Sequence, residues 1–146
     1  RRVKIKFDEN ISTRLVEAIR RLDPDPSIEI GSVAEDYGNG TADPDWMFRF
    51  RDEGGVAMVS GDHAILQKPV NLVAYTESGL ISIWPDAGWP KLKRWGQAAM
   101  MVRWWPVIKA QIMVSGAGDR WRFPMQWTPS ADAFKPVRDP RVDRDA

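Results

Sequence analysis

Residues 55–63 have the sequence Gly55-Val56-Ala57-Met58-Val59-Ser60-Gly61-Asp62-His63, in which a short apolar run ends in a turn and a carboxylate. The run 56–59 predicts a buried strand, and Ser60-Gly61 predicts a turn after it. In α/β proteins, ligands bind at the carboxyl ends of parallel strands. We therefore expect Asp62 to lie where a ligand would bind.

The start of the chain repeats this arrangement. Residues 3–7 alternate apolar and basic side chains, which predicts a strand with one face in water, and Asp8-Glu9-Asn10 follows directly. A helical face comes next, formed by Ile11, Leu15, Ile19 and Leu22. Asn10 or Ser12 could cap this helix, and the prolines within residues 23–26 end it. A strand, a helix and a second strand in this order predict a parallel βαβ unit.

The rest of the chain continues the alternation of strands and helices. Residues 71–75 fit a helix or a strand equally well, and Pro106 should kink or split the long helix. The other expected elements are a strand at 27–34, a loop at 35–42, a helix at 44–53, a strand at 80–84, a helix at about 90–114 and a final edge strand at 119–123. This pattern predicts an α/β fold with a mainly parallel central sheet.

Length and composition limit the possible functions. The 146 residues suit one ordinary domain, and the absence of cysteine excludes a disulfide scaffold, a zinc–thiolate site and a cysteine nucleophile. No apolar run is long enough to span a bilayer, and no signal-peptide pattern is present, so we expect no membrane partner and a cytoplasmic location. The formal net charge of +1 neither favours nor excludes nucleic acid; only the distribution of charge could decide.

We expect one domain over residues 1–127 and a tail over residues 128–146. The tail is rich in proline, aspartate and arginine, and its main apolar side chains are Phe134 and Val137. A segment with so little to bury predicts disorder, or order only on a partner.

Carboxylates gather at the boundaries between the expected elements. They form four groups, which are Asp8 with Glu9, Glu35 with Asp36, Asp43 with Asp45, and Asp62 alone. Carboxylates that meet at strand ends repel one another unless a cation neutralises them. Mg²⁺ and Mn²⁺ prefer oxygen ligands, and such an ion can polarise a phosphoryl oxygen and activate water.

Each of these acids also has a structural explanation. Asp43 before Pro44 suits a helix N-cap, Asp62 suits a turn, and the pair Asp8-Glu9 suits the positive end of a helix dipole. His63, the single histidine, fits a surface residue better than a ligand. No single position is specific, so the hypothesis of a metal site depends on the ordered set.

That ordered set resembles the compact PIN-like domains, including those of VapC-type toxins. The similarity lies in Asp8-Glu9-Asn10 after the first strand, Thr41-Ala42-Asp43-Pro44 opening a helix, and Ser60-Gly61-Asp62 after an apolar strand. It covers about residues 3–85. It implies a Rossmann-like, three-layer α/β fold and a ribonuclease that depends on Mg²⁺ or Mn²⁺.

The resemblance assigns roles to individual residues. It implies that Asp8, Asp43 and Asp62 are metal ligands and that Glu9 is a supporting acid. Two positions depart from the family pattern, Ser60 where threonine is common and Ala64 where a second acid often follows. By resemblance to VapC-type toxins, we also expect an antitoxin protein as partner, and a homodimer is a further expectation.

An RNA substrate would need cations and flat side chains to hold it. The candidate cations are Arg14 on the first helix and, around the long helix, Lys91, Lys93, Arg94, Arg103 and Lys109. Each of them could equally be part of a solvated helix face. Trp95, Trp104, Trp105 and Trp121 exceed what one core easily buries, so some of them could form a protein interface.

Two other functions remain open. A response-regulator receiver domain also has an acidic pair after its first strand, but its strand-terminal Lys-Pro has no good counterpart, because Lys68-Pro69 follows Asp62 too closely and Lys135-Pro136 lies in the tail. A non-catalytic interaction module on a PIN-like fold is the other alternative, and Ala64 keeps it open.

Overall fold

The computed structural model describes residues 2–61 and 69–138. Within these residues the chain forms one sheet of six strands in the order β2-β1-β3-β4-β5-β6, and only the pairing of β5 with β6 is antiparallel. The strands are Val3–Phe7 (β1), Ile28–Ser32 (β2), Gly55–Val59 (β3), Ile81–Pro85 (β4), Arg120–Phe123 (β5) and Lys135–Pro136 (β6). The expected α/β fold with a mainly parallel sheet is confirmed.

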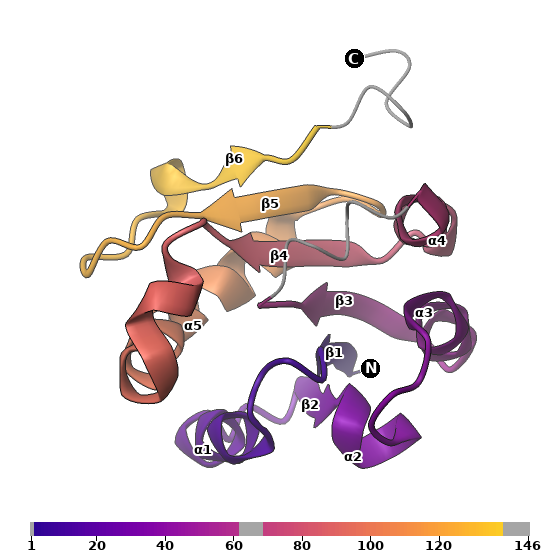
Figure 1. Cartoon of the computed structure of the whole chain (residues 1–146), viewed down its shortest axis with the longest axis horizontal. Coiled ribbons are helices and arrows are strands. Elements are labelled where there is room, and N and C mark those ends of the chain that lie inside the picture. The colour runs from indigo at the N-terminus through magenta and orange to yellow at the C-terminus, as the bar shows by residue number, and fades with distance from the viewer. Residues whose placement is uncertain (1, 62–68, 139–146) are drawn as a thin grey trace.

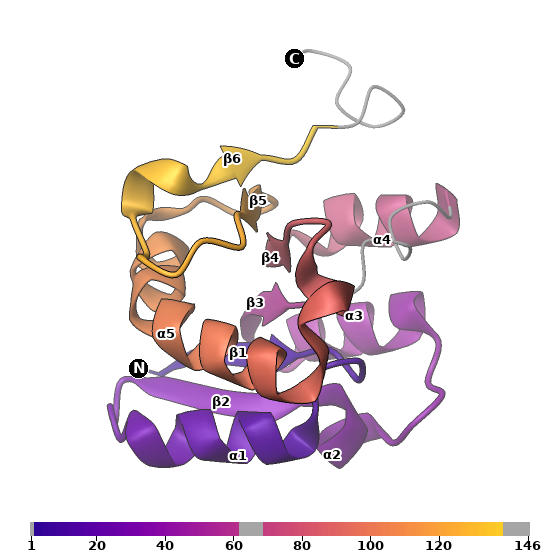
Figure 2. The same cartoon turned by 60° about the vertical axis from the view of Figure 1, so that its left-hand side comes forward.

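Helices cover both faces of this sheet (Figures 1 and 2). On one face, α1 and α5 pack against the side chains of Ile5 and Phe7, and on the other, α3 and α4 pack against Met58 and Trp84. The helices are Thr13–Leu22 (α1), Val33–Tyr37 (α2), Asp43–Asp52 (α3), Pro69–Ser78 (α4) and Lys93–Val114 (α5), with short 3-10 turns at Trp89–Leu92 (η2) and Ala131–Ala133 (η3). None of the helices in the described ranges has the length and apolar character that a bilayer crossing requires.

Lys6, on the basic side of β1, is buried, contrary to the expected wet face, whereas Lys4 stays half-exposed. The Lys6 side chain is covered by α2 and α3, because its ammonium lies over the rings of Tyr37 and Phe50. The Lys6 side chain forms an ion pair of 2.7 Å with Asp36, and its ammonium lies 4.2 Å from the centre of the Tyr37 ring. A buried lysine is tolerated here because a carboxylate and an aromatic ring replace its water.

The prediction of a loop from residue 35 is wrong at its start, because α2 occupies Val33–Tyr37. The Ser32 hydroxyl accepts a hydrogen bond from the Glu35 backbone N–H at 3.1 Å. Serine followed three residues later by glutamate is a known start signal for a helix. The expected strand at 27–34 therefore ends at Ser32, where this cap begins.

The long helix α5 is neither split nor ended by Pro106. Pro106 lies on the exposed side of the helix, and the two residues that precede it, Trp104 and Trp105, are buried. The loss of one backbone hydrogen bond on the solvent side is thus offset by packing on the other side. Trp121 is half-buried and Trp95 is exposed, so the core buries two of the four tryptophans in question, Trp104 and Trp105.

The tail differs from its expected state where the structure describes it. Residues 128–138 lie along β5, where β6 pairs antiparallel with it, so β5 is not the edge strand. Phe134 is buried against the rings of Trp104 and Phe123, at 5.7 and 6.4 Å between centroids. A single aromatic anchor thus attaches this segment to the main core, and residues 139–146 lie outside the described range.

Candidate metal and nuclease site

Asp8 lies at the carboxyl end of β1, where the sheet brings the ends of β1 and β3 together. Its backbone N–H donates to the carbonyl of Val59, the last residue of β3, at 2.9 Å. Its carboxylate is 1% exposed and accepts a hydrogen bond from the Ser60 hydroxyl at 3.0 Å. Ser60 is itself buried, so it fixes the orientation of the Asp8 side chain.

Asp43 is the first residue of α3 and not its N-cap. Ala42 occupies the cap position and makes no side-chain capping bond. One carboxylate oxygen of Asp43 accepts from the indole N–H of Trp46 at 3.1 Å, and the other accepts a long contact of 3.5 Å from the Asn71 amide. The cap explanation for Asp43 is therefore wrong, because Ala42 is the N-cap, and the carboxylate of Asp43 accepts from two side chains.

Asp8 and Asp43 lie within electrostatic reach of each other. The pKa of Asp8 is raised to about 6, chiefly by burial and also by the negative charge of Asp43, whereas the Ser60 hydrogen bond opposes the rise. Two carboxylates in this arrangement destabilise each other when both are ionised. A perturbed acid beside a like charge is a common mark of a functional site.

Asp62 and its neighbours His63 and Ala64 lie outside the described residues. The chain is described up to Gly61, whose backbone N–H donates to the Asn10 side-chain oxygen at 3.0 Å. Within residues 2–61 and 69–138, no three His, Cys, Asp or Glu side chains gather closely enough to hold a metal ion together. Of the three expected ligands, Asp8 and Asp43 thus interact electrostatically, Asp62 lies outside the described residues, and their role as metal ligands stays a prediction.

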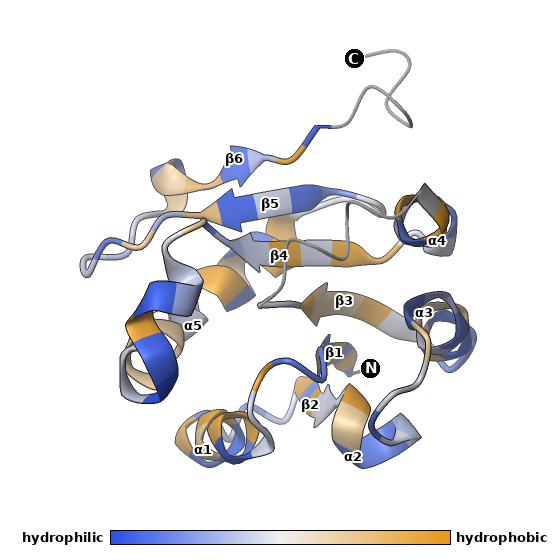
Figure 3. Ribbon diagram, viewed as in Figure 1, coloured by the Kyte–Doolittle hydropathy of each residue, from blue (hydrophilic) through white to orange (hydrophobic). Residues whose placement is uncertain are grey.

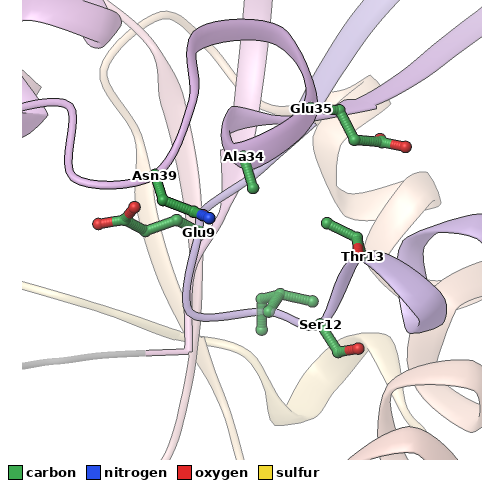
Figure 4. A pocket seen from close by; sticks show the side chains of 7 residues that line it. Glu9, Ser12, Thr13, Ala34, Glu35 and Asn39 are labelled. Carbon is green, nitrogen blue, oxygen red and sulfur yellow. The ribbon is translucent and has the colours of Figure 1, made fainter.

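Glu9 points to the loop before α3. Its carboxylate accepts a hydrogen bond from the Gly40 backbone N–H at 2.8 Å. Glu9 also lines a polar cavity of about 450 Å³, and Figure 4 shows that the lining comes from the loop after β1, the start of α1, and α2 with the loop that follows it. Glu9 thus ties down the loop that leads to Asp43, and it does not join Asp8 and Asp43 in one described cluster.

The part of the sequence that forms the first four strands and the helices between them matches a known family. The sequence model described as "PIN like domain" matches residues 3–87, more than half of the chain. The chain belongs to the PIN-like domain family. No curated protein and no solved structure matches it. PIN-like domains are often nucleases, so membership supports a hydrolase in coarse terms, and α5, β5 and β6 lie beyond the matched region.

The basic residues expected to hold RNA fall into two groups in this PIN-like domain. Arg14 is exposed in the first turn of α1, and Lys91, Lys93 and Arg94 are exposed where η2 passes into α5. Lys109, by contrast, forms ion pairs with Asp23 at 2.9 Å and with Asp25 at 3.4 Å. The ammonium of Lys109 therefore makes a structural contact with the end of α1.

Sequence reasoning missed the residues that position the two acids. The sequence predicts Ser60 as a turn residue and as a departure from a family pattern, yet its hydroxyl donates directly to Asp8. Trp46 and Asn71 were not considered as partners of Asp43. A polar Asn71 among the apolar residues of α4 was a visible signal, because a buried amide needs a partner.

Proposed function

We propose that this protein is a metal-dependent endoribonuclease of the PIN type, the toxin of a toxin–antitoxin pair. The single observation that supports the proposal is the buried Asp8 at the carboxyl end of β1, whose ionised form is disfavoured by burial and by the negative charge of Asp43. The substrate would be RNA, and the partner would be an antitoxin protein, with a homodimer as a further expectation.

The side chains present suit Mg²⁺ or Mn²⁺. Carboxylate oxygens are the ligands that these hard cations prefer, and a cation beside Asp8 and Asp43 would relieve their repulsion. We assign Asp62 as a third ligand because it follows β3, whose end is hydrogen-bonded to Asp8. When bound, the ion would supply a Lewis acid for the phosphoryl group and a lower pKa for an attacking water.

The neighbouring residues would orient this site. The Ser60 hydroxyl holds one oxygen of Asp8, and the Trp46 indole holds one oxygen of Asp43. Glu9 fixes the loop before α3 through Gly40, which makes it a supporting acid. Arg14, Lys91, Lys93 and Arg94 would neutralise the RNA phosphates.

The proposal is tested by cleavage of an unstructured RNA with Mg²⁺ or Mn²⁺ and with a chelator. We expect the chelator, Asp8→Asn and Asp43→Asn each to remove detectable cleavage. Ser60→Ala should lower activity by about 10–100-fold, because it removes an orienting partner and not a ligand.

Asp45→Asn is the matched control, since Asp45 is an exposed acid in the same turn of α3. It should cleave at the wild-type rate. Cleavage that survives Asp8→Asn, or that resists the chelator, would contradict the proposal. A protein that binds an antitoxin-like partner but never cleaves RNA would instead be an interaction module.

A further inference from the structure

Charge is divided sharply between the matched region and the rest of the chain. Residues 3–87 contain eight basic and fifteen acidic side chains, a formal charge of −7, whereas residues 88–138 contain nine basic and two acidic side chains, a formal charge of +7. The overall balance of +1 hides this division. Figure 3 shows the hydrophilic character of β5 and β6, which belong to the basic part. A basic surface beside an acidic site favours a polyanionic ligand.

One side of α5 carries an exposed stripe within this basic part. Its residues are spaced by four, four, three and four, which places them on one helical face. The stripe is formed by Trp95, Ala99, Arg103, Pro106 and Ala110. Trp95 is 85% exposed, although the structure buries most other large apolar side chains. Such an exposed indole is a candidate for contact with a ligand.

A second indole lies over the same stripe. The Trp127 ring lies 5.2 Å from the Arg103 guanidinium, and the Arg103 Nε donates to the Trp127 carbonyl at 3.2 Å. The preceding carbonyl, that of Gln126, accepts from the buried Trp104 indole at 2.8 Å. Trp127 is therefore held in place from both sides of its backbone while its side chain stays 58% exposed.

The stripe begins at the carboxyl end of the sheet. A Cβ atom on Gly61 would lie 2.9 Å from the indole nitrogen of Trp89, so η2 packs against the chain that leads from β3 toward Asp62. Lys91, Lys93 and Arg94 follow Trp89 directly and are exposed. Three exposed cations thus lie between Trp89 and Trp95 in the sequence.

We infer that α5 and Trp127 form a binding track for single-stranded RNA, in which unpaired bases stack on Trp95 and Trp127 and the phosphates contact Lys91, Lys93, Arg94 and Arg103. The inference rests on the proposed nuclease, because it supplies the substrate path to that site. Trp95 and Arg103 are separated by about 12 Å along the helix, since each residue rises 1.5 Å. The small Ala99 between them leaves the track open.

The spacing favours nucleic acid over a protein partner. A protein interface has an apolar centre in which large side chains adjoin. Here the two exposed indoles belong to separate segments, and the guanidinium of Arg103 lies against the ring of one of them, Trp127. Single-stranded nucleic acids are held by this combination of aromatic faces and positive charge.

The test measures binding of an end-labelled oligouridylate by fluorescence anisotropy, in a chelator so that no cleavage occurs. Trp95→Ala and Trp127→Ala should each weaken binding by about 5- to 100-fold, and Trp95→Phe should retain most of the affinity. Leu22→Ala, at an exposed apolar residue of α1, should bind as the wild type does. Wild-type affinity in both tryptophan variants would overturn the track.

A second pair of variants guards against misfolding. Ala99→Glu places a negative charge inside the track, and Ala110→Glu places the same charge on the same stripe beyond Pro106. We expect only Ala99→Glu to weaken binding, and equal effects would contradict the location. Competition by polyglutamate that is as strong as competition by unlabelled RNA would overturn base stacking and point to an acidic protein segment.

Failure of the track and failure of the nuclease give different results. RNA binding that depends on both tryptophans, in a protein that cleaves nothing with Mg²⁺ or Mn²⁺, would support the track and remove the nuclease. Metal-dependent cleavage together with RNA binding that is unchanged in both tryptophan variants would support the nuclease and overturn the track.

Discussion

Two aspartates at the ends of α1 behave in opposite ways. Asp8, before the helix, lies close to Asp43, and its pKa is raised to about 6 by burial and by that second acid. Asp23, directly after the helix, accepts hydrogen bonds from the Lys109 ammonium at 2.9 Å and the Trp105 indole at 2.7 Å. Burial would raise the pKa of Asp23, but these hydrogen bonds outweigh it and hold the pKa below its ordinary value.

The difference separates a structural acid from a candidate functional one. Asp23 has its cation within the fold, where Lys109 joins the end of α1 to α5. Asp8 has a serine and a like charge, so among the partners that the structure describes its ionised form has no counter-charge. An acid that the fold leaves electrostatically unfavourable is better explained by a ligand than by stability.

The larger expected effect is at Asp23. Asp23→Ala should lower the free energy of unfolding by about 2–3 kcal/mol, because it removes hydrogen bonds to a charged group and leaves the Trp105 N–H without its partner. Chemical denaturation at neutral pH measures this loss. Lys109→Met, which removes the cation alone, should lower the free energy of unfolding by less. An Asp23→Ala protein as stable as the wild type would contradict the structural role of Asp23.

The smaller effect, of opposite sign, is at Asp8. In a chelator at pH 7, Asp8→Asn should raise the free energy of unfolding by about 1–2 kcal/mol, because the raised pKa shows that folding disfavours the ionised carboxylate. The asparagine oxygen can still accept from Ser60 and its amide can donate toward Asp43.

The pH dependence fixes the sign of this second effect. The folded protein binds the Asp8 proton more tightly than the unfolded chain does, so the wild type loses stability as the pH rises from about 4 to about 6. The difference between Asp8→Asn and the wild type should therefore grow over that interval and be small below it. A difference that is constant with pH, or a destabilised variant, would contradict the assignment.

Periodicity and the order of the elements were enough to predict the parallel sheet. Strand-end chemistry predicts that Asp8 and Asp43 share a cation, and this stays a prediction. Prediction failed where a distant contact decided the outcome. Lys6 looked like a solvent-facing lysine because nothing local shows that α2 brings Asp36 over it. The composition of residues 128–138 predicts a segment too polar to pack. Nothing local shows that Phe134 packs against Trp104 of α5 and Phe123 of β5.

Other errors could have been avoided from the sequence. Ser32 and Glu35 have the spacing of a capping box, and this signal predicts the start of α2 correctly. The division between an acidic first part and a basic second part was also present in the sequence, but total charge conceals it. The partner of Asp43, by contrast, required the structure, since Asn71 comes from a helix 28 residues away.

The most direct test of the account is the change in melting temperature on adding Mg²⁺ or Mn²⁺. A ligand at 100 times its Kd stabilises a protein by about 2.7 kcal/mol, so wild type, Asp23→Ala and Asp45→Asn should all melt at higher temperature with the ion. Asp8→Asn and Asp43→Asn should show no such rise. A rise of the same size in Asp8→Asn, or no rise in the wild type, would contradict the claim that these two acids share a cation.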